Sequence, residues 1–271
     1  MEVFDVLFNK ASIYDMLFFN IKHVSKYPTY MELMEKEPEL AKQWDFIAKT
    51  KYSVSDIEGI PEVMNDCYQN KSVFYPEFCK IVAITYATIE NDNGGLKRNL
   101  KRIAFHDEFN VINIFNNVLL KISSDGMQST PKYFPVLCGH NIINNDIPLY
   151  LKRLLSHRND FKSGDNIIPY ILKNYLKSKP WDANILDTIN VWKFNGMSNT
   201  PLSVISEHMG LKKTVELDEM IDLSKNYWQL FNNEDNTEDT NTSDKALEYV
   251  SLQSATQTNL SVQLINDLRI R

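Results

Sequence analysis

The stretch Leu137–Leu155, LCGHNIINNDIPLYLKRLL, constrains the fold more than any other part of the chain. The apolar run from Phe134 to Cys138 predicts the end of a buried strand, and Gly139-His140-Asn141 predicts a turn. Beyond Asp146, leucines recur at helical spacing, namely Leu149, Leu151, Leu154 and Leu155. A strand-to-helix crossing of this kind places the Asp146 carboxylate at the mouth of an α/β sheet, where metal and phosphate chemistry usually occur.

Three further strands are expected before this crossing and one after it. Met16–Val24 is apolar and then alternates, and Phe78–Ile89 is rich in β-branched and aromatic residues. The turn signal Asn91–Gly95 leads into a partner strand over Leu100–Phe105, so these two segments predict a hairpin. Ile185–Val191 is expected to be a short strand that holds Asp187.

The remaining segments predict helices and loops. A helix or a broken helix is expected over Glu32–Ala48. Helices are expected over Glu108–Ile122, Asp165–Lys177, Pro201–Met209, Asp222–Phe231 and from a cap at Ser243 or Asp244 to the C-terminus. Segments without a clear period predict an excursion over Ser53–Lys71, a loop over Ser123–Lys132 and an acidic, solvated loop over Asn232–Ser243.

This order of elements predicts an α/β fold with a mixed central sheet, three antiparallel strands followed by parallel strands, flanked by helices. With 271 residues the chain can bury one large core. We expect a single domain over 1–271, with an N-terminal extension at 1–15, the acidic Asn-rich loop at 232–243 and a C-terminal helix at 244–271.

The amino-acid composition restricts the classes of partner that the chain is expected to bind. The formal charge of −6 argues against a strong general affinity for nucleic acid and favours protein partners. The three cysteines, Cys67, Cys79 and Cys138, are scattered and indicate neither a disulfide framework nor a zinc site. The first residues lack a signal-peptide pattern, and no apolar run is long enough to cross a bilayer, so an intracellular origin without a membrane partner is expected.

Three segments together resemble one family, namely Phe74–Ile89, Gly139–Leu155 and Lys179–Phe194. The family is the DnaQ-like 3′–5′ exonucleases related to the exonuclease domain of family-B DNA polymerases, within the ribonuclease H-like superfamily. The resemblance runs from about Met16 to the C-terminus and implies a ribonuclease H-like fold. It also implies phosphodiester hydrolysis by two divalent metals, Mg²⁺ or Mn²⁺, held by four acidic residues in three motifs.

Three of those four acidic positions are changed in this chain. The first motif, which reads like FDIETV in the family, aligns with Phe19–Val24, so that Asp becomes Asn20 and Glu becomes Lys22. The second motif keeps Asp146. The third motif, Y-C-x-x-D-V, keeps Tyr249 but has Gln253 in place of the metal-binding Asp.

Lys22 is the change that weighs most against metal binding. An ammonium has no lone pair to offer, and its repulsion of a dication at about 4 Å is several kcal/mol even with an effective dielectric near 20. We therefore expect Lys22 to pair with Asp146, and with Asp187 as a further candidate, and to fill the metal position.

These residues predict a catalytically inactive exonuclease-like protein, with no cofactor, redeployed in a larger assembly of protein chains. The Asn-rich composition and the decayed replication-type fold suggest a structural part of a bacteriophage particle. The alternatives are a residual exonuclease that uses Mg²⁺ or Mn²⁺, and a pseudonuclease that binds DNA ends without cutting.

Other polar residues have weaker signals. His140 is expected to make polar contacts at a strand end, and a role in supporting the site is the alternative. For Asp187 a carboxylate that supports the site and a strand-end hydrogen bond to neighbouring backbone are both open. The densest basic cluster comprises Lys97, Arg98, Lys101 and Arg102, and it is either a nucleic-acid contact or the solvated edge of a hairpin.

Overall fold

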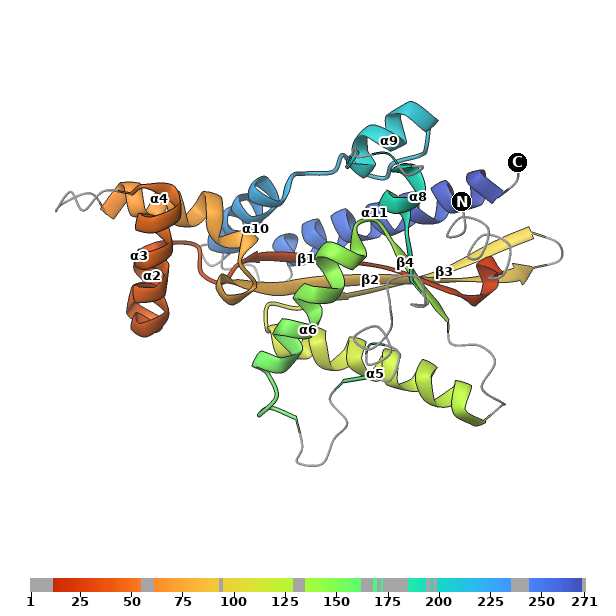
Figure 1. The fold of residues 1–271 in the computed structure, drawn as a ribbon, viewed down its shortest axis with the longest axis horizontal. Coiled ribbons are helices and arrows are strands. Elements are labelled where there is room, and N and C mark those ends of the chain that lie inside the picture. The colour runs from red at the N-terminus through yellow and green to blue at the C-terminus, as the bar shows by residue number, and fades with distance from the viewer. Residues whose placement is uncertain are drawn as a thin grey trace.

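The computed structural model describes residues 12–54, 61–92, 95–128, 135–161, 168–169, 172, 185–193, 196, 199–234 and 244–269. Its centre is a five-stranded mixed sheet in the order β3-β2-β1-β4-β5 (Figure 1). The strands are β1 (Met16–Ser25), β2 (Cys79–Asp92), β3 (Gly95–Ala104), β4 (Val136–Gly139) and β5 (Ile185–Asp187). β1, β2 and β3 are antiparallel neighbours, whereas β1–β4 and β4–β5 are parallel pairs. The predicted α/β fold with a mixed sheet is therefore confirmed.

Helices cover both faces of the sheet because β1 and β2 are apolar on both faces. Leu17, Phe19 and Ile21 of β1 pack on one side with α5 (Glu108–Gln128) and α6 (Ile147–Ser156). Met16 and Phe18 point to the other side, toward α11 (Lys245–Arg269). This alternation follows from the two-residue period of a strand. α11 lies along β1 and β2, and Figure 1 shows it on the face opposite α5.

Shorter helices complete that second face. Three helices contact α11 and bury much of its surface, namely α8 (Thr188–Lys193), α9 (Leu202–Met209) and α10 (Met220–Glu234). Asp244 caps α11, because the Leu247 N–H donates to Asp244 Oδ1 at 3.1 Å, as one of the two predicted caps required. Within the described ranges no helix is both long and apolar enough to span a membrane.

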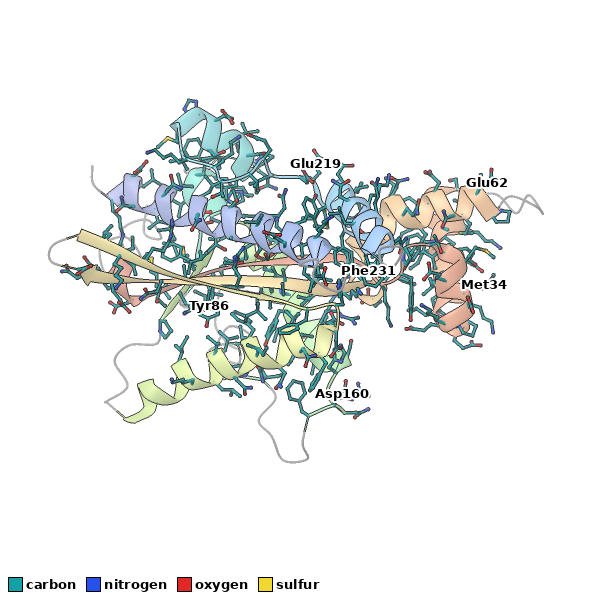
Figure 2. The ribbon with its side chains drawn as sticks, turned by 180° about the vertical axis from the view of Figure 1, so that it is seen from behind. Met34, Glu62, Tyr86, Asp160, Glu219 and Phe231 are labelled. Carbon is teal, nitrogen blue, oxygen red and sulfur yellow. The ribbon has the colours of Figure 1, made fainter. Side chains whose placement is uncertain are left out.

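A helical lobe stands at one end of the sheet (Figures 1 and 2). It consists of α2 (Tyr30–Lys36), α3 (Pro38–Tyr52) and α4 (Pro61–Lys71), followed by the 3₁₀ turns η2 (Ser72–Phe74) and η3 (Pro76–Phe78). Trp44 is fully buried at its centre, with the rings of Tyr68 and Phe78 edge-on at 5.3 Å and 5.1 Å. Of the N-terminal extension predicted at 1–15, residues 12–15 are described, as the 3₁₀ turn η1 (Ile13–Asp15) and the Ser12 before it.

The segment Glu32–Ala48 is a broken helix, which is one of its two predicted forms, because Pro38 begins a new helix after Glu37. Several other predicted boundaries are wrong. The excursion expected over Ser53–Lys71 contains α4, and α5 continues to Gln128, into the expected loop. The strand expected over Ile185–Val191 ends at Asp187 and α8 follows directly.

Two further expectations fall partly outside the described residues. Of the helix expected over Asp165–Lys177, the structure describes residues 168, 169 and 172 alone, so most of that prediction lies outside the described residues. Of the loop expected over Asn232–Ser243, residues up to Glu234 belong to α10, and the rest is not described.

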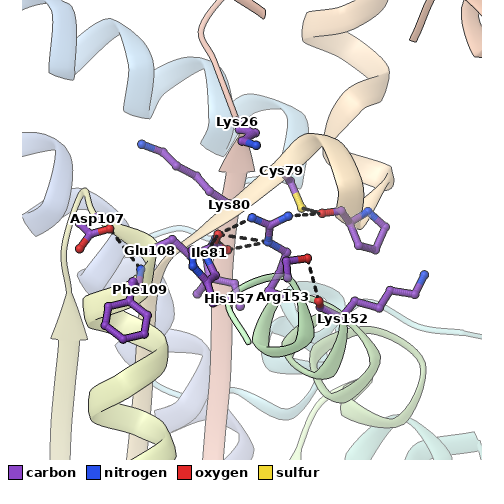
Figure 3. Close-up of polar contacts among 12 residues, drawn as sticks. Lys26, Cys79, Lys80, Ile81, Asp107, Glu108, Phe109, Lys152, Arg153 and His157 are labelled. Carbon is purple, nitrogen blue, oxygen red and sulfur yellow. Dashed lines mark hydrogen bonds and ion pairs between the residues drawn. The ribbon is translucent and has the colours of Figure 1, made fainter. Parts of the chain in front are cut away.

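A buried ion pair joins α5, α6 and β2 (Figure 3). Glu108, 6% exposed, accepts hydrogen bonds from the Ile81 N–H of β2 at 2.7 Å and from Arg153 Nε at 2.9 Å. Arg153 also donates to the Pro76 carbonyl at 3.1 Å, and His157 Nε2 lies 2.9 Å from Glu108 Oε2. Burial alone would raise the pKa of Glu108, but the bonds from His157 and Arg153 outweigh it and lower that pKa. The network is therefore charged, and it fixes both helices against the sheet.

Candidate functional site

Asp146 ends a tight turn at the carboxyl end of β4. Gly139 closes that strand, and a Cβ there would lie 2.6 Å from the Phe19 carbonyl of β1 and 2.5 Å from a methyl carbon of Ile142. Asn141 then takes a left-handed conformation with φ of 60°. The π-helical turn η4 (Ile142–Asp146) leads from there into α6. The predicted strand-to-helix crossing is thus present, and it delivers the Asp146 side chain toward the middle of β1.

The Asp146 carboxylate is buried and already hydrogen-bonded. Its Oδ2 accepts from the Ile21 N–H at 3.1 Å and from Asn20 Nδ2 at 3.3 Å, and its Oδ1 accepts from Asn145 Nδ2 at 2.8 Å. The residue is 1% exposed. Three internal donors therefore occupy lone pairs that a metal ion would need.

Asn20 and Lys22 lie two residues apart on β1, so both face α11. Lys22 Nζ donates to Gln257 Oε1 of α11 at 2.6 Å. Within the described residues it forms no ion pair with Asp146 or Asp187, so the expected pairing is wrong. The physical reason is that α11 lies directly over this face of β1 and offers the nearer acceptor.

Burial shifts both charged groups of this site toward their neutral forms. It lowers the pKa of Lys22 to about 8, against the opposing attraction of Asp146 and Asp218. It also raises the pKa of Asp146 to about 7, against the hydrogen bonds from Asn145 and Ile21 and the attraction of Lys22. The electrostatic attraction between Lys22 and Asp146 thus offsets part of the effect of burial on each pKa, although the two side chains form no ion pair.

Gln253 forms hydrogen bonds to a different part of the chain from Asp146. Its Oε1 accepts from the Asp218 N–H at 3.1 Å and its Nε2 donates to the Glu216 carbonyl at 2.8 Å. Further along α11, Gln263 Oε1 accepts from the Lys212 N–H at 2.9 Å, and Gln263 Nε2 donates to the Lys212 carbonyl at 3.0 Å. We call the connection Leu211–Glu219 between α9 and α10 the strap, since two glutamines of α11 fasten its backbone.

Tyr249 also contacts the strap. Its hydroxyl donates to Asp218 Oδ2, and Asn226 Nδ2 donates to the same oxygen at 3.0 Å and to the Tyr249 hydroxyl at 3.1 Å. Burial, together with the bond to Asp218, raises the pKa of Tyr249. Tyr249 and Gln253, which the resemblance places in its third motif, therefore both contact the strap in this chain.

His140 and Asp187 make polar contacts at the ends of β4 and β5. Asp187 accepts the backbone N–H groups of Asn141, Ile143 and Ile189 at 2.7, 3.0 and 3.1 Å, so it holds the turn before Asp146. His140 lies between the Thr188 hydroxyl at 2.9 Å and the Thr200 carbonyl at 3.2 Å. Burial lowers the pKa of His140 to about 4, so its imidazole is neutral at pH 7.

The basic residues of β3 form two pairs instead of one cluster. Ile103 and Leu100 pack on opposite faces of the sheet, with the α5 side and the α11 side respectively. By alternation, Lys97 and Lys101 share the face of Ile103, and Arg98 and Arg102 share that of Leu100. Arg102 accordingly donates to Ser251 of α11 at 3.4 Å.

The residues present do not fit a two-metal centre. Of the four positions that the resemblance assigns to ligands, only Asp146 carries a carboxylate, and Lys22 brings a positive charge to the same face of β1. Across the described ranges, no group of three or more His, Cys, Asp or Glu side chains is placed to share a metal ion.

Residues missed by sequence reasoning are Gln257, Asp218, Glu216 and Gln263. Gln257 follows Gln253 by four residues on α11, so helical spacing placed it on the same side of that helix. No local pattern brings the strap to α11.

Comparison with known proteins gives no match: no family model, no curated protein and no solved structure is similar to this chain.

Proposed function

We propose that this chain is a ribonuclease H-like, exonuclease-type scaffold that no longer cuts nucleic acid and serves as a protein-binding or assembly component. The strand order β3-β2-β1-β4-β5, with two antiparallel pairs and then two parallel ones, supports the fold assignment. So does the position of Asp146 at the carboxyl end of β4, beside β1, as a three-motif nuclease site requires.

The observation that carries the proposal is that hydrogen bonds from the protein itself occupy both oxygens of the Asp146 carboxylate. Its two oxygens accept three protein donors, and the flanking Lys22 replaces a carboxylate with an ammonium. A buried carboxylate that accepts several hydrogen bonds serves as a structural anchor between β1 and α6. Gln253, which would supply the last ligand in the family, fastens the strap instead.

A residual metal-dependent exonuclease is the second candidate, and one atom favours it. Asn20 Oδ1 is buried and has no hydrogen-bond partner among the described residues, and an amide oxygen is a ligand that Mg²⁺ and Mn²⁺ accept. The charge of Lys22 opposes metal binding at this position.

The acidic composition favours binding to other protein chains over binding to DNA. A bacteriophage particle remains the predicted setting of such an assembly.

Metal binding and cleavage test the proposal together. Calorimetry with Mn²⁺ and a 3′-end cleavage assay on single-stranded DNA should show no difference between the natural chain and Asp146→Asn. The register is checked with Asn20→Asp/Lys22→Glu, which adds two carboxylates to that of Asp146 and should strengthen Mn²⁺ binding by about tenfold or more. Two Mn²⁺ ions bound by the natural chain and lost in Asp146→Asn, together with nucleotide release, would establish the exonuclease instead.

A further inference from the structure

The outer edge of β3 is a ten-residue surface open to a further strand. β3 pairs with β2 along its whole length from Gly95 to Ala104, and it stands last in the sheet order. No described residue pairs with its other edge. Most of its side chains are exposed, including Leu96 at 47%. An edge of this length presents unpaired backbone groups that a chain in extended conformation can bind.

The charges on this edge define what can bind there. Lys97 and Lys101 lie on the α5 face of the sheet, and Arg98 and Arg102 lie on the α11 face. Four cations therefore flank one strand, two on each side, in a chain whose formal charge is −6. Cationic edges keep like strands apart, because a second β3 would bring lysine and arginine against the same residues. They attract a strand that carries acids on both of its faces.

The chain itself contains such a strand in its sequence. β3 reads Lys-Arg-x-x-Lys-Arg over 97–102, and the segment at 234–239 reads Glu-Asp-x-x-Glu-Asp. In an extended chain, residues four apart share a face. Glu234 and Glu238 would thus face one pair of cations while Asp235 and Asp239 face the other. Glu234 is the last residue of α10, so only the frayed end of a helix has to unwind.

We infer that the edge of β3 binds the acidic segment Glu234–Asp239 of a second copy of this chain. The inference names the partner for the proposed assembly role and rests on it in that respect. The added strand runs antiparallel to β3, which places Glu234 and Asp235 beside Lys101 and Arg102, and Glu238 and Asp239 beside Lys97 and Arg98.

The segment of the same copy cannot make this match. Asp244 is held by His106, which lies just beyond the end of β3. A residue opposite Lys97 is nine positions from His106, or about 30 Å at the rise of a strand. Asp244 is five positions after Asp239, and even a fully extended chain of that length spans about 18 Å. In the parallel direction Glu234 of the same copy would have to lie beside Lys97, but Phe231, three residues before it, packs on His106 with ring centroids 4.7 Å apart. The acid pairs that face all four cations therefore come from another molecule.

Charge reversal on either partner tests the inference. Sedimentation velocity at low salt should show reversible association of the full-length chain that weakens as salt is added. Lys97→Glu/Arg98→Glu and, separately, Glu238→Lys/Asp239→Lys should each raise the dissociation constant by about tenfold or more. An equimolar mixture of the two variants should restore it to within about threefold of the natural value. Lys42→Glu/Lys49→Glu on α3 makes the same charge change far from β3 and serves as the matched control.

The outcomes separate this inference from other uses of the same surface. A chain that stays monomeric at all concentrations overturns it, as does equal weakening by the α3 control. Loss of association in the β3 variant without rescue by mixing would assign the edge to a different partner, and that too overturns it. Loss of single-stranded DNA binding in the β3 variant, with no self-association, would assign the edge to nucleic acid. None of these results bears on metal binding or cleavage, which test the proposed function separately.

Discussion

At the scale of single residues, the central fact is that Asp146 and Lys22 are buried near each other without touching. Each is held by neutral partners, Asp146 by backbone and amide N–H groups and Lys22 by Gln257. A buried ion pair in direct contact needs near-ideal geometry to offset desolvation. Here hydrogen bonds to neutral groups carry that role, which explains how one carboxylate and one ammonium persist inside the fold.

Asp146 should make stability depend on pH. Its folded pKa of about 7 lies above the ordinary value of 3.8, so the folded state holds the proton more tightly than the unfolded state does. That contribution is fully present below pH 3.8 and is lost as the pH rises to about 7. Urea unfolding between pH 4 and pH 8 should therefore show a loss of stability in the natural chain that Asp146→Asn lacks. Parallel pH profiles for the two proteins would contradict the assignment.

At the scale of elements, α11 organises the second face of the sheet. Small polar residues such as Ser254 and Thr258 let it approach β1 and β2 closely. Ser254 Oγ accepts from the Thr85 N–H at 3.1 Å and donates to the Asn20 carbonyl at 3.0 Å. The same helix also holds the strap through hydrogen bonds to Gln253 and Gln263. α11 thus lies between the sheet and the strap, and it excludes solvent from the Lys22 side of β1.

The two glutamines should protect strap amides from exchange. The N–H groups of Lys212 and Asp218 donate to Gln263 and Gln253, so Gln253→Ala/Gln263→Ala should speed hydrogen–deuterium exchange at those amides by about fivefold. Gln43→Ala, which removes an exposed glutamine from α3, is the control and should leave strap exchange unchanged. Unaltered exchange in the double variant would show that the strap is held by other contacts.

At the scale of the whole molecule, the buried pair Glu108–Arg153 connects elements that are distant in sequence. It joins the start of α5, the middle of α6, β2 and the turn at Pro76 (Figure 3). Folding free energies are typically about 5–15 kcal/mol, so the loss of one member of such a network affects the entire fold.

Arg153→Met should destabilise the chain by about 3–5 kcal/mol, because it leaves Glu108 buried without its main cation. Glu108→Leu/Arg153→Met removes both charges and should recover most of that loss. Urea unfolding of the two variants and the natural chain provides the measurement, and Lys152→Met, one position away and exposed, is the control. A double variant no more stable than Arg153→Met would mean that the hydrogen bonds to Ile81 and Pro76 matter more than the charges.

Much of the fold could be predicted from the sequence because its signals are local. The alternation in β1, the β-branched run in β2, the apolar period of α5 and the caps of α9 and α11 each depend on residues within one segment. Boundaries failed where local signals were weak, as for α4, or where a strand passes directly into a helix, as at Asp187 and Thr188.

By itself, the sequence predicted most of the elements, their order, and the side chains Asn20, Lys22 and Gln253 at positions where the resemblance leads us to expect carboxylates. Only the tertiary structure decided what those side chains do instead. The strap reaches α11 from 35 residues away in the chain, and the partner of Lys22 lies on a helix 235 residues further on. Such contacts depend on how helices pack across a sheet, and no periodicity within one segment encodes them.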